Sequence, residues 1–117
     1  MDIFFEKYHG TGNDFIMIDN RSLLLPRVYT DAYALWCHRR FGIGADGVIL
    51  IQNRAGYDFE MVYYNADGKE GTMCGNGGRC AVAFARTVGV FTDNTTRFIA
   101  ADGLHRAAID PQTGMVS

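Results

Sequence analysis

The 117-residue sequence is poor in proline and cysteine, with two and three residues respectively, and it has a single tryptophan. Three cysteines are not the even, dense set that a secreted disulfide framework requires, so we expect reduced thiols in the cytoplasm. The longest apolar run, Val48–Ile51, is far shorter than the roughly 20 residues of a membrane span, and the N-terminus lacks a signal-peptide pattern. The sequence therefore favours a cytoplasmic protein and predicts no membrane partner.

Charge of one sign does not dominate, since 11 basic and 13 acidic side chains give a net charge of −2. The basic residues are scattered rather than gathered in a stripe, which argues against a nucleic-acid partner. Cys74 and Cys80 lack the C-x-x-C spacing of zinc or redox sites, and the three histidines show no spacing typical of metal ligands. We therefore predict no metal site.

Hydrophobic residues make up 48% of the chain, enough for one domain with its own core. Apolar periodicity predicts helices over Thr30–Arg40 and Asn76–Val88, the second ended by Gly89. Short apolar runs predict strands, and Asp102-Gly103 is typical of a two-residue hairpin turn. The expected strands are Phe15–Asp19, Val48–Ile51, Asp58–Tyr63, Arg97–Ala101 and Leu104–Ile109.

The segment Gly42–Gly47 matches the G-x-G-x-x-G string of dinucleotide-binding loops. Such a loop follows a strand and opens a helix, so that the phosphate meets the helix N-terminus. Here the predicted order is reversed, because a helix precedes the glycines and a strand follows them. The sequence favours a glycine-rich turn from helix to strand over a nucleotide site.

The strongest chemical signal is a cysteine that directly precedes a cluster of glycines. Gly75, Gly77 and Gly78 remove side chains from the backbone just after Cys74, so a small ligand can approach the peptide N–H groups. The same residues open the predicted helix, whose first N–H groups lack internal partners and whose dipole favours negative charge. This arrangement suits a ligand carboxylate and stabilises the Cys74 thiolate, although an isolated cysteine is more often a small buried residue.

Four glycine-rich motifs occur in order between residues 3 and 89. They are HGTGNDF at His9–Phe15, RFGIGADG at Arg40–Gly47, NADG at Asn65–Gly68 and CGNGGRC at Cys74–Cys80. Together they resemble the amino-terminal half of the diaminopimelate epimerase family. These enzymes are cofactor-independent racemases that invert an α-carbon with two cysteines and no pyridoxal phosphate.

The resemblance implies an α+β fold in which a curved, mostly antiparallel sheet wraps around a central helix. The segment Asn76–Val88, apolar on several faces, suits that helix. The resemblance also implies that Cys74 is one of the two acid/base cysteines. It further implies that Gly75 and Asn76 bind the α-carboxylate of the substrate through the helix N-terminus, with no bound cofactor.

Asn13 and Asn65 match family positions that contact the substrate. A side-chain amide carries both a donor and an acceptor, so it can recognise a zwitterionic amino acid without adding charge. A turn-forming role for each asparagine is equally compatible with the sequence. Asp46 and Asp67 lie beside glycines and are more typical of turn carboxylates than of catalytic ones, and Gly47 stands where some members have glutamine.

In the family, the opposing cysteine, a glutamate and an arginine come from a carboxy-terminal domain of similar fold. This chain stops at Ser117, just after Met115-Val116, which has the pattern of a starting strand. We therefore expect residues 1–117 to be the amino-terminal domain of a longer protein and to be inactive alone. Cys37 and Cys80 do not suit the opposing role, because Cys37 is expected in the packing of the first helix and helix geometry turns Cys80 away from Cys74.

The expected function is the interconversion of LL- and meso-diaminopimelate in lysine and peptidoglycan precursor synthesis. The expected partners are this small amino acid, the missing carboxy-terminal domain and a second copy, since full-length relatives are often dimers. Two alternatives stay open on sequence alone. One is a non-catalytic binding or assembly module that keeps the carboxylate-binding turn, and the other is a related racemase that acts on proline or hydroxyproline.

Overall fold

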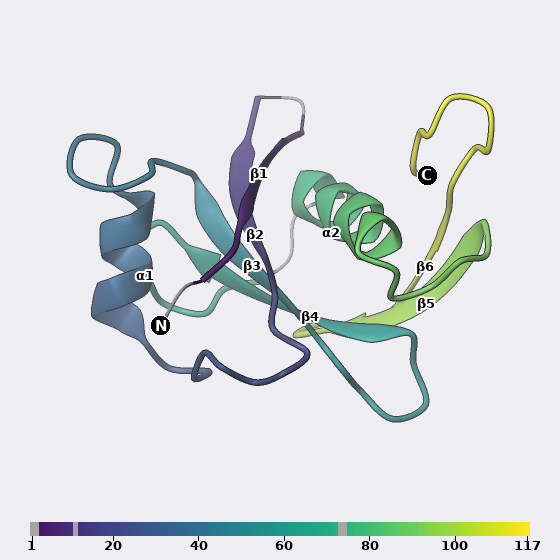
Figure 1. Ribbon diagram of the computed structural model, residues 1–117, viewed down its shortest axis with the longest axis horizontal. Helices are drawn as coiled ribbons and strands as arrows, with labels where there is room; N and C mark the ends of the chain where they lie inside the picture. The colour runs from purple at the N-terminus through teal and green to yellow at the C-terminus, as the bar shows by residue number, and fades with distance from the viewer. Residues whose placement is uncertain (1–2, 11, 73–74) are drawn as a thin grey trace.

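The computed structural model describes residues 3–10, 12–72 and 75–117, and Figure 1 shows their arrangement. Six strands form one sheet in the order β1-β2-β3-β4-β5-β6, and two helices pack against it. No helix among these residues is long and apolar enough to cross a membrane. The elements are β1 (Glu6–His9), β2 (Asp14–Asp19), α1 (Thr30–Cys37), β3 (Gly47–Gln52), β4 (Phe59–Asn65), α2 (Gly75–Thr87), β5 (Thr95–Ala100) and β6 (Gly103–Ala108).

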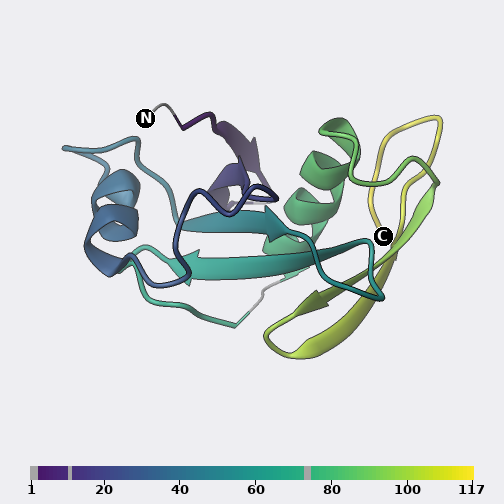
Figure 2. The ribbon, with the colours of Figure 1, turned by 60° about the horizontal axis from the view of Figure 1, so that its bottom comes forward.

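The sheet is mixed, with three antiparallel pairs of strands and two parallel ones. The parallel pairs are β2–β3, joined through α1, and β4–β5, joined through α2. Such crossovers are almost always right-handed. Because β3 and β4 run in opposite directions, as Figure 2 shows, two right-handed crossovers place α1 and α2 on opposite faces of the sheet.

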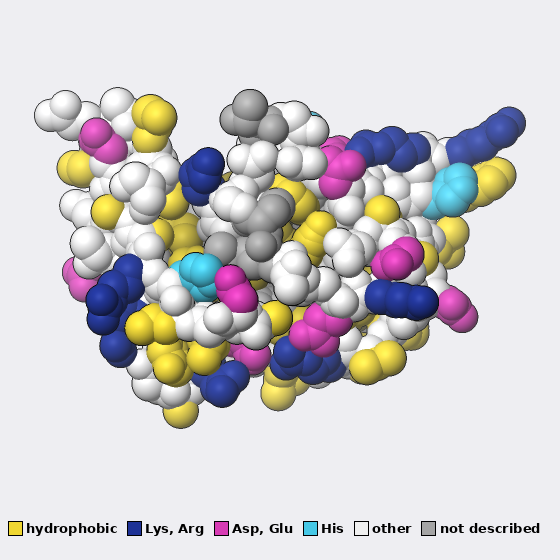
Figure 3. All heavy atoms as spheres, turned by 180° about the vertical axis from the view of Figure 1, so that it is seen from behind, with side chains coloured by type: hydrophobic (Ala, Val, Ile, Leu, Met, Phe, Trp, Pro, Cys, Tyr) yellow, Lys and Arg dark blue, Asp and Glu magenta, His cyan; other side chains and the backbone are white. Residues whose placement is uncertain are grey.

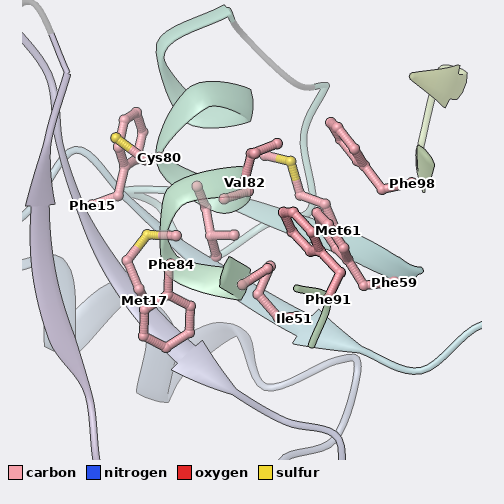
Figure 4. Packing of buried hydrophobic residues seen from close by; sticks show 13 residues of the cluster. Phe15, Met17, Ile51, Phe59, Met61, Cys80, Val82, Phe84, Phe91 and Phe98 are labelled. Atoms are coloured by element: carbon pink, nitrogen blue, oxygen red, sulfur yellow. The ribbon is translucent and has the colours of Figure 1, made fainter. Parts of the chain in front are cut away.

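Alternating residues of the central strands feed a separate core on each face. On one face, Phe15, Met17 and Ile51 pack with the residues of α2, which Figure 4 shows from close by. On the other face, Ile16 and Val48 pack with side chains of α1. Since β3 is buried along its whole length on both faces, the prediction of a fully buried strand there is confirmed.

The central helix α2 lies in the concave side of the sheet, with β1 and β2 to one side and the β5–β6 hairpin to the other (Figure 1). It ends at Thr87, one residue before the predicted end at Val88, and the predicted stop residue Gly89 has a φ of +83°, in the left-handed region. The N–H of Gly89 is bonded to the carbonyl of Arg86, and that of Val90 to the carbonyl of Ala85, which is a Schellman cap. The expected α+β fold with a mostly antiparallel sheet around a central helix is confirmed.

The first helix is shorter than predicted, because it ends at Cys37 rather than continuing to Arg40. His38 has an extended backbone, and its ring Nδ1 accepts bonds from the N–H groups of Arg40 at 3.1 Å and Phe41 at 3.2 Å. A side chain that takes these N–H groups competes with the helix for them. The chain therefore turns away one helical turn early.

Two strand predictions need correction. The segment Glu6–His9 is a strand that pairs with β2, although the sequence analysis assigned no element there. The hairpin loop is Ala101-Asp102 rather than Asp102-Gly103, since Ala100 pairs with Gly103. Gly103 has a φ of +115°, which fits a glycine that follows the turn instead of lying within it.

The surface carries interspersed basic and acidic side chains on the face that Figure 3 shows. This agrees with the scattered basic residues of the sequence. The described residues contain no group of three or more His, Cys, Asp or Glu side chains that could hold a metal ion.

Phe59 joins the sheet to its outer hairpin through ring contacts. Its ring stacks on Phe98 at 4.8 Å between centroids, and β4 pairs with β5 at only two positions. We predict that Phe59→Ala lowers the free energy of unfolding by about 3–5 kcal/mol, the usual cost of a large core cavity. Phe41→Ala is the control, because Phe41 is 73% exposed and should change stability by less than about 0.5 kcal/mol. Urea denaturation of both variants measures this, and equal stabilities would contradict the assignment.

Candidate functional site

Strand directions bring three segments to one edge of the sheet. β2 and β3 are parallel and start side by side, with Phe15 opposite Gly47. β4 runs the other way, so its last residue, Asn65, lies opposite the same Gly47. The loops that enter β2 and β3 and the segment that leads from β4 into α2 therefore meet at this edge.

The β1–β2 loop contacts the start of α2 directly. Asn76 Nδ2 donates a hydrogen bond to Asn13 Oδ1 at 2.9 Å, across 63 positions of sequence. Gly10 packs so closely here that a Cβ on it would lie 2.8 Å from the Cβ of Asn76. A glycine at position 10 is thus required for the approach. The structure brings together two of the predicted binding residues, Asn13 and Asn76.

A cluster of charged groups holds the β1–β2 loop against the loop between α1 and β3, next to Asn13. Asp14, which is 9% exposed, accepts bonds from Arg39 at 2.8 and 3.0 Å and pairs with Lys7 at 2.9 Å. Asp46 accepts bonds from the N–H of Asp14 at 3.0 Å and from Asn13 Nδ2 at 3.2 Å. Hydrogen bonds from Arg39, above all, hold the pKa of Asp14 well below its usual range. The cluster fixes the position of Asn13.

Asn65 is held by a separate set of contacts at the end of β4. Its N–H is bonded to the carbonyl of Lys69, and its carbonyl accepts from the N–H of Gly68. Its side-chain amide packs against Gly71, where a Cβ would lie 2.4 Å from Asn65 Nδ2. The backbone of Asn65 thus belongs to a turn, and its side chain lies beside the segment that leads into α2.

The electrostatic character of the α2 N-terminus suits an anion. The first turn consists of Gly75, Asn76, Gly77 and Gly78, so it carries no acidic side chain. Its N–H groups and the helix dipole supply partial positive charge. Arg79, which is exposed and lies within 3.4 Å of the Gly75 carbonyl, adds a full one. A carboxylate or another small anion is the ligand class that this end of the helix favours.

The predicted catalytic residue, Cys74, lies outside the described residues, and the structure leaves its assignment as a prediction. The helix that the sequence placed after it begins at Gly75, the next residue. The two described cysteines are buried in opposite cores, Cys37 on the α1 face and Cys80 on the α2 face. Burial raises the pKa of Cys37 to about 11, so it is a thiol at neutral pH.

A hollow of about 430 Å³ lies along the first two turns of α2. Gly10 and Asn76 line it, together with Arg79 and Tyr8. Larger hollows of about 610 and 520 Å³ lie beside β5–β6 and beside the N-terminal segment, away from the α2 N-terminus. Of these three hollows, the one of about 430 Å³ is the candidate ligand site, since it alone borders the N-terminus of α2.

Other sequence interpretations have clear outcomes. The glycine-rich segment Gly42–Gly47 leads from α1 into β3, so the turn is confirmed and the nucleotide site is not supported. Asp67 accepts a bond from the N–H of Lys69 at 2.9 Å, as expected for a turn carboxylate. The pairing of Asp14 with Arg39 is not predictable from the sequence, because no short-range pattern links residues 25 positions apart.

The pairing of Asp14 predicts a pH-dependent contribution to stability. A carboxylate whose pKa is lowered in the folded state stabilises it above the unfolded pKa, near 3.8, and this contribution is lost as pH falls below that value. We expect Asp14→Asn to reduce the free energy of unfolding by about 2 kcal/mol at pH 7, as for bonds to a charged group. The difference from the unmodified protein should shrink between pH 4 and pH 2 in urea denaturation series. A difference that is constant over that range would contradict the ion pairing.

Solved structures share this fold. A methylitaconate-delta-isomerase structure matches with a TM-score of 0.70 over 99% of this chain and 62% of its own, at 15% identity. A phenazine biosynthesis protein of the PhzF family from Bacillus anthracis matches with a TM-score of 0.67 over 97% of this chain and 37% of its own, at 14% identity. Such low identity shows a common fold and nothing more specific.

Sequence relatives are more informative. The diaminopimelate epimerase of Flavobacterium psychrophilum is 60% identical over 104 residues, which cover 89% of this chain and 40% of the relative. That of Chlorobaculum tepidum is 50% identical over 101 residues, 86% of this chain and 39% of the relative. The chain thus spans about two fifths of the length of these relatives. The family model described as "Diaminopimelate epimerase" matches residues 5–116, and the chain therefore belongs to this family.

Proposed function

We propose that this chain provides one half of the active site of a diaminopimelate epimerase, which interconverts LL- and meso-diaminopimelate for lysine and peptidoglycan precursor synthesis. The observation that supports this most is the meeting of Asn13 and Asn76 at the start of α2, in a chain of this family. The proposal includes a reduced, cytoplasmic protein, since thiols that exchange protons cannot be joined in a disulfide.

The substrate binds through its α-amino-acid group in this proposal. Its carboxylate takes hydrogen bonds from the backbone N–H groups of Gly75 and Asn76, where the helix dipole adds to the attraction. The side-chain amides of Asn13 and Asn65 offer donors and acceptors to the ammonium and carboxylate without introducing charge. Arg79 raises the positive potential around this site from the side.

Inversion of the α-carbon requires that a proton leave one face and another arrive on the opposite face. In our proposal, the Cys74 thiolate takes the α-proton, or its thiol gives one in the reverse direction. The negative charge that develops next to the carboxylate is stabilised by the N–H groups already aimed at it. No pyridoxal phosphate is part of this scheme, because the helix end takes over the stabilisation of the carbanion-like state.

The opposing thiol has to come from outside the described residues of this chain. Cys37 lies in the core on the other side of the sheet from α2. Cys80 belongs to α2 itself and packs beside Phe15, as Figure 4 shows. Both are buried, at 3% and 5% exposure. We therefore propose that the carboxy-terminal part of the longer protein supplies the second cysteine.

The two-part site predicts that the 117 residues alone do not turn over LL-diaminopimelate. Fusion to the carboxy-terminal part of the Flavobacterium psychrophilum relative, 60% identical over 104 residues, should restore activity. The formation of meso-diaminopimelate is measured by chiral chromatography. The same fusion with Cys74→Ala is the control and should be inactive. Turnover by the 117 residues alone would contradict the proposal.

Thiol reactivity gives a second prediction, for which the chain holds its own control. Iodoacetamide at pH 7 should alkylate Cys74 in the folded protein and leave Cys37 unmodified, because the pKa of Cys37 is raised to about 11 and its side chain is buried. Peptide mass spectrometry measures both sites, and diaminopimelate should slow the reaction at Cys74. If Cys74 reacts no faster than in the urea-unfolded protein, the chain is better explained as a binding or assembly module.

A further inference from the structure

Asp46 stands at the far end of a series of side-chain hydrogen bonds that leads to the start of α2. Its Oδ2 accepts bonds from Asn13 Nδ2 at 3.2 Å and from the N–H of Asp14 at 3.0 Å. Its Oδ1 accepts a bond from Arg39 at 3.2 Å, and its own N–H is bonded to Asp14 Oδ1 at 3.1 Å. The carboxylate is thus held in place by groups other than Asn13.

The chemistry of these groups gives the series one direction. A carboxylate only accepts hydrogen bonds, whereas a side-chain amide donates from its nitrogen and accepts at its oxygen. Asp46 therefore takes the nitrogen end of Asn13, and Asn13 Oδ1 then accepts from Asn76 Nδ2 at 2.9 Å. As a result, the nitrogen end of the Asn76 amide faces the β1–β2 loop.

We propose that Asp46 is a positioning residue that orients the Asn13 amide for the substrate and, through it, the Asn76 side chain. The inference rests on the proposed function, in which the Asn13 amide and the Asn76 backbone N–H contact the substrate, and it extends the site by one hydrogen bond. Without Asp46 the Asn13 amide loses the acceptor that fixes its nitrogen end, and the substrate has to order this amide as it binds. The loss therefore falls on KM more than on kcat.

Kinetics of the completed two-part enzyme test this directly. Asp46→Ala should raise KM for diaminopimelate roughly tenfold, the factor for one hydrogen bond to a charged group, with kcat within about twofold. Asp46→Asn keeps an oxygen that can accept from Asn13 and should recover most of the affinity. Asp58→Asn is the matched control, because this exposed carboxylate likewise accepts from a side chain, Thr96, and a backbone N–H, that of Arg97.

A double variant separates positioning from general support of the fold. Once Asn13→Ala has removed the link, adding Asp46→Ala should leave KM where Asn13→Ala put it. An equal rise in KM from Asp46→Ala in both backgrounds would overturn the inference, as would an unchanged KM in the single variant. Should Asp46→Ala not fold, Asp46→Ser serves the same purpose, because its shorter side chain does not reach Asn13.

A measurement without substrate distinguishes failure of this inference from failure of the proposed function. Exchange of the Asn76 Nδ2 protons with water, followed by NMR, should become several-fold faster in Asp46→Ala and stay unchanged in Asp58→Asn. Unchanged exchange in Asp46→Ala would overturn the positioning role, whether or not the completed enzyme is active. An inactive enzyme with accelerated exchange would refute the proposed function and support the role of Asp46.

Discussion

The buried carboxylate of Asp14 is the interaction on which the site depends. It pairs with both Arg39 and Lys7 and at the same time accepts the N–H of Asp46, so that three segments distant in sequence are fixed at one edge of the sheet. A buried carboxylate without its partners would be costly, whereas a paired one locks the geometry of its neighbours. The hydrogen bonds that Asn13 donates to Asp46 and that Asn76 donates to Asn13 build on this fixed point.

The fold places this edge where a charged ligand can use a helix end. The ends of β2, β3 and β4 lie side by side there, and α2 starts beyond them with glycines, which place no side chain over its first N–H groups. The two cores, one on each face of the sheet, hold α1 and α2 independently. Asn13 is tied to this end of the sheet through Asp46, and Asn65 is the last residue of β4, so the proposed half-site is anchored to the sheet. Such anchoring suits a reaction that needs donors already aimed at the developing charge.

Part of this arrangement is predictable from sequence because its causes are local. The buried strand at Val48–Ile51, the helix after Cys74 and its stop at Gly89 follow from apolar runs and from glycine, which decide backbone geometry within a few residues. Other features depend on distant partners. The hydrogen bond between Asn13 and Asn76 spans 63 positions of sequence, and no periodicity predicts it.

The predictions that were wrong or incomplete concern the end of α1, the strand β1 and the role of Asn65. The ring of His38 takes two backbone N–H groups and ends α1 early, a competition that apolar periodicity does not register. β1 was missed because its alternation is weak: the strand is an edge strand with exposed ends and only partly buried middle residues. The backbone bonds of Asn65 place it at a turn, and a substrate contact of its side chain stays a proposal.

Binding of the substrate carboxylate at the start of α2 is the central claim, and an NMR titration of the completed protein tests it most directly. Diaminopimelate should shift the backbone amide resonances of Gly75 and Asn76 in a saturable way. The corresponding diamine, 1,5-diaminopentane, keeps both amino groups but lacks both carboxylates and should leave these resonances in place. Equal shifts with both compounds, or none with diaminopimelate, would contradict the account.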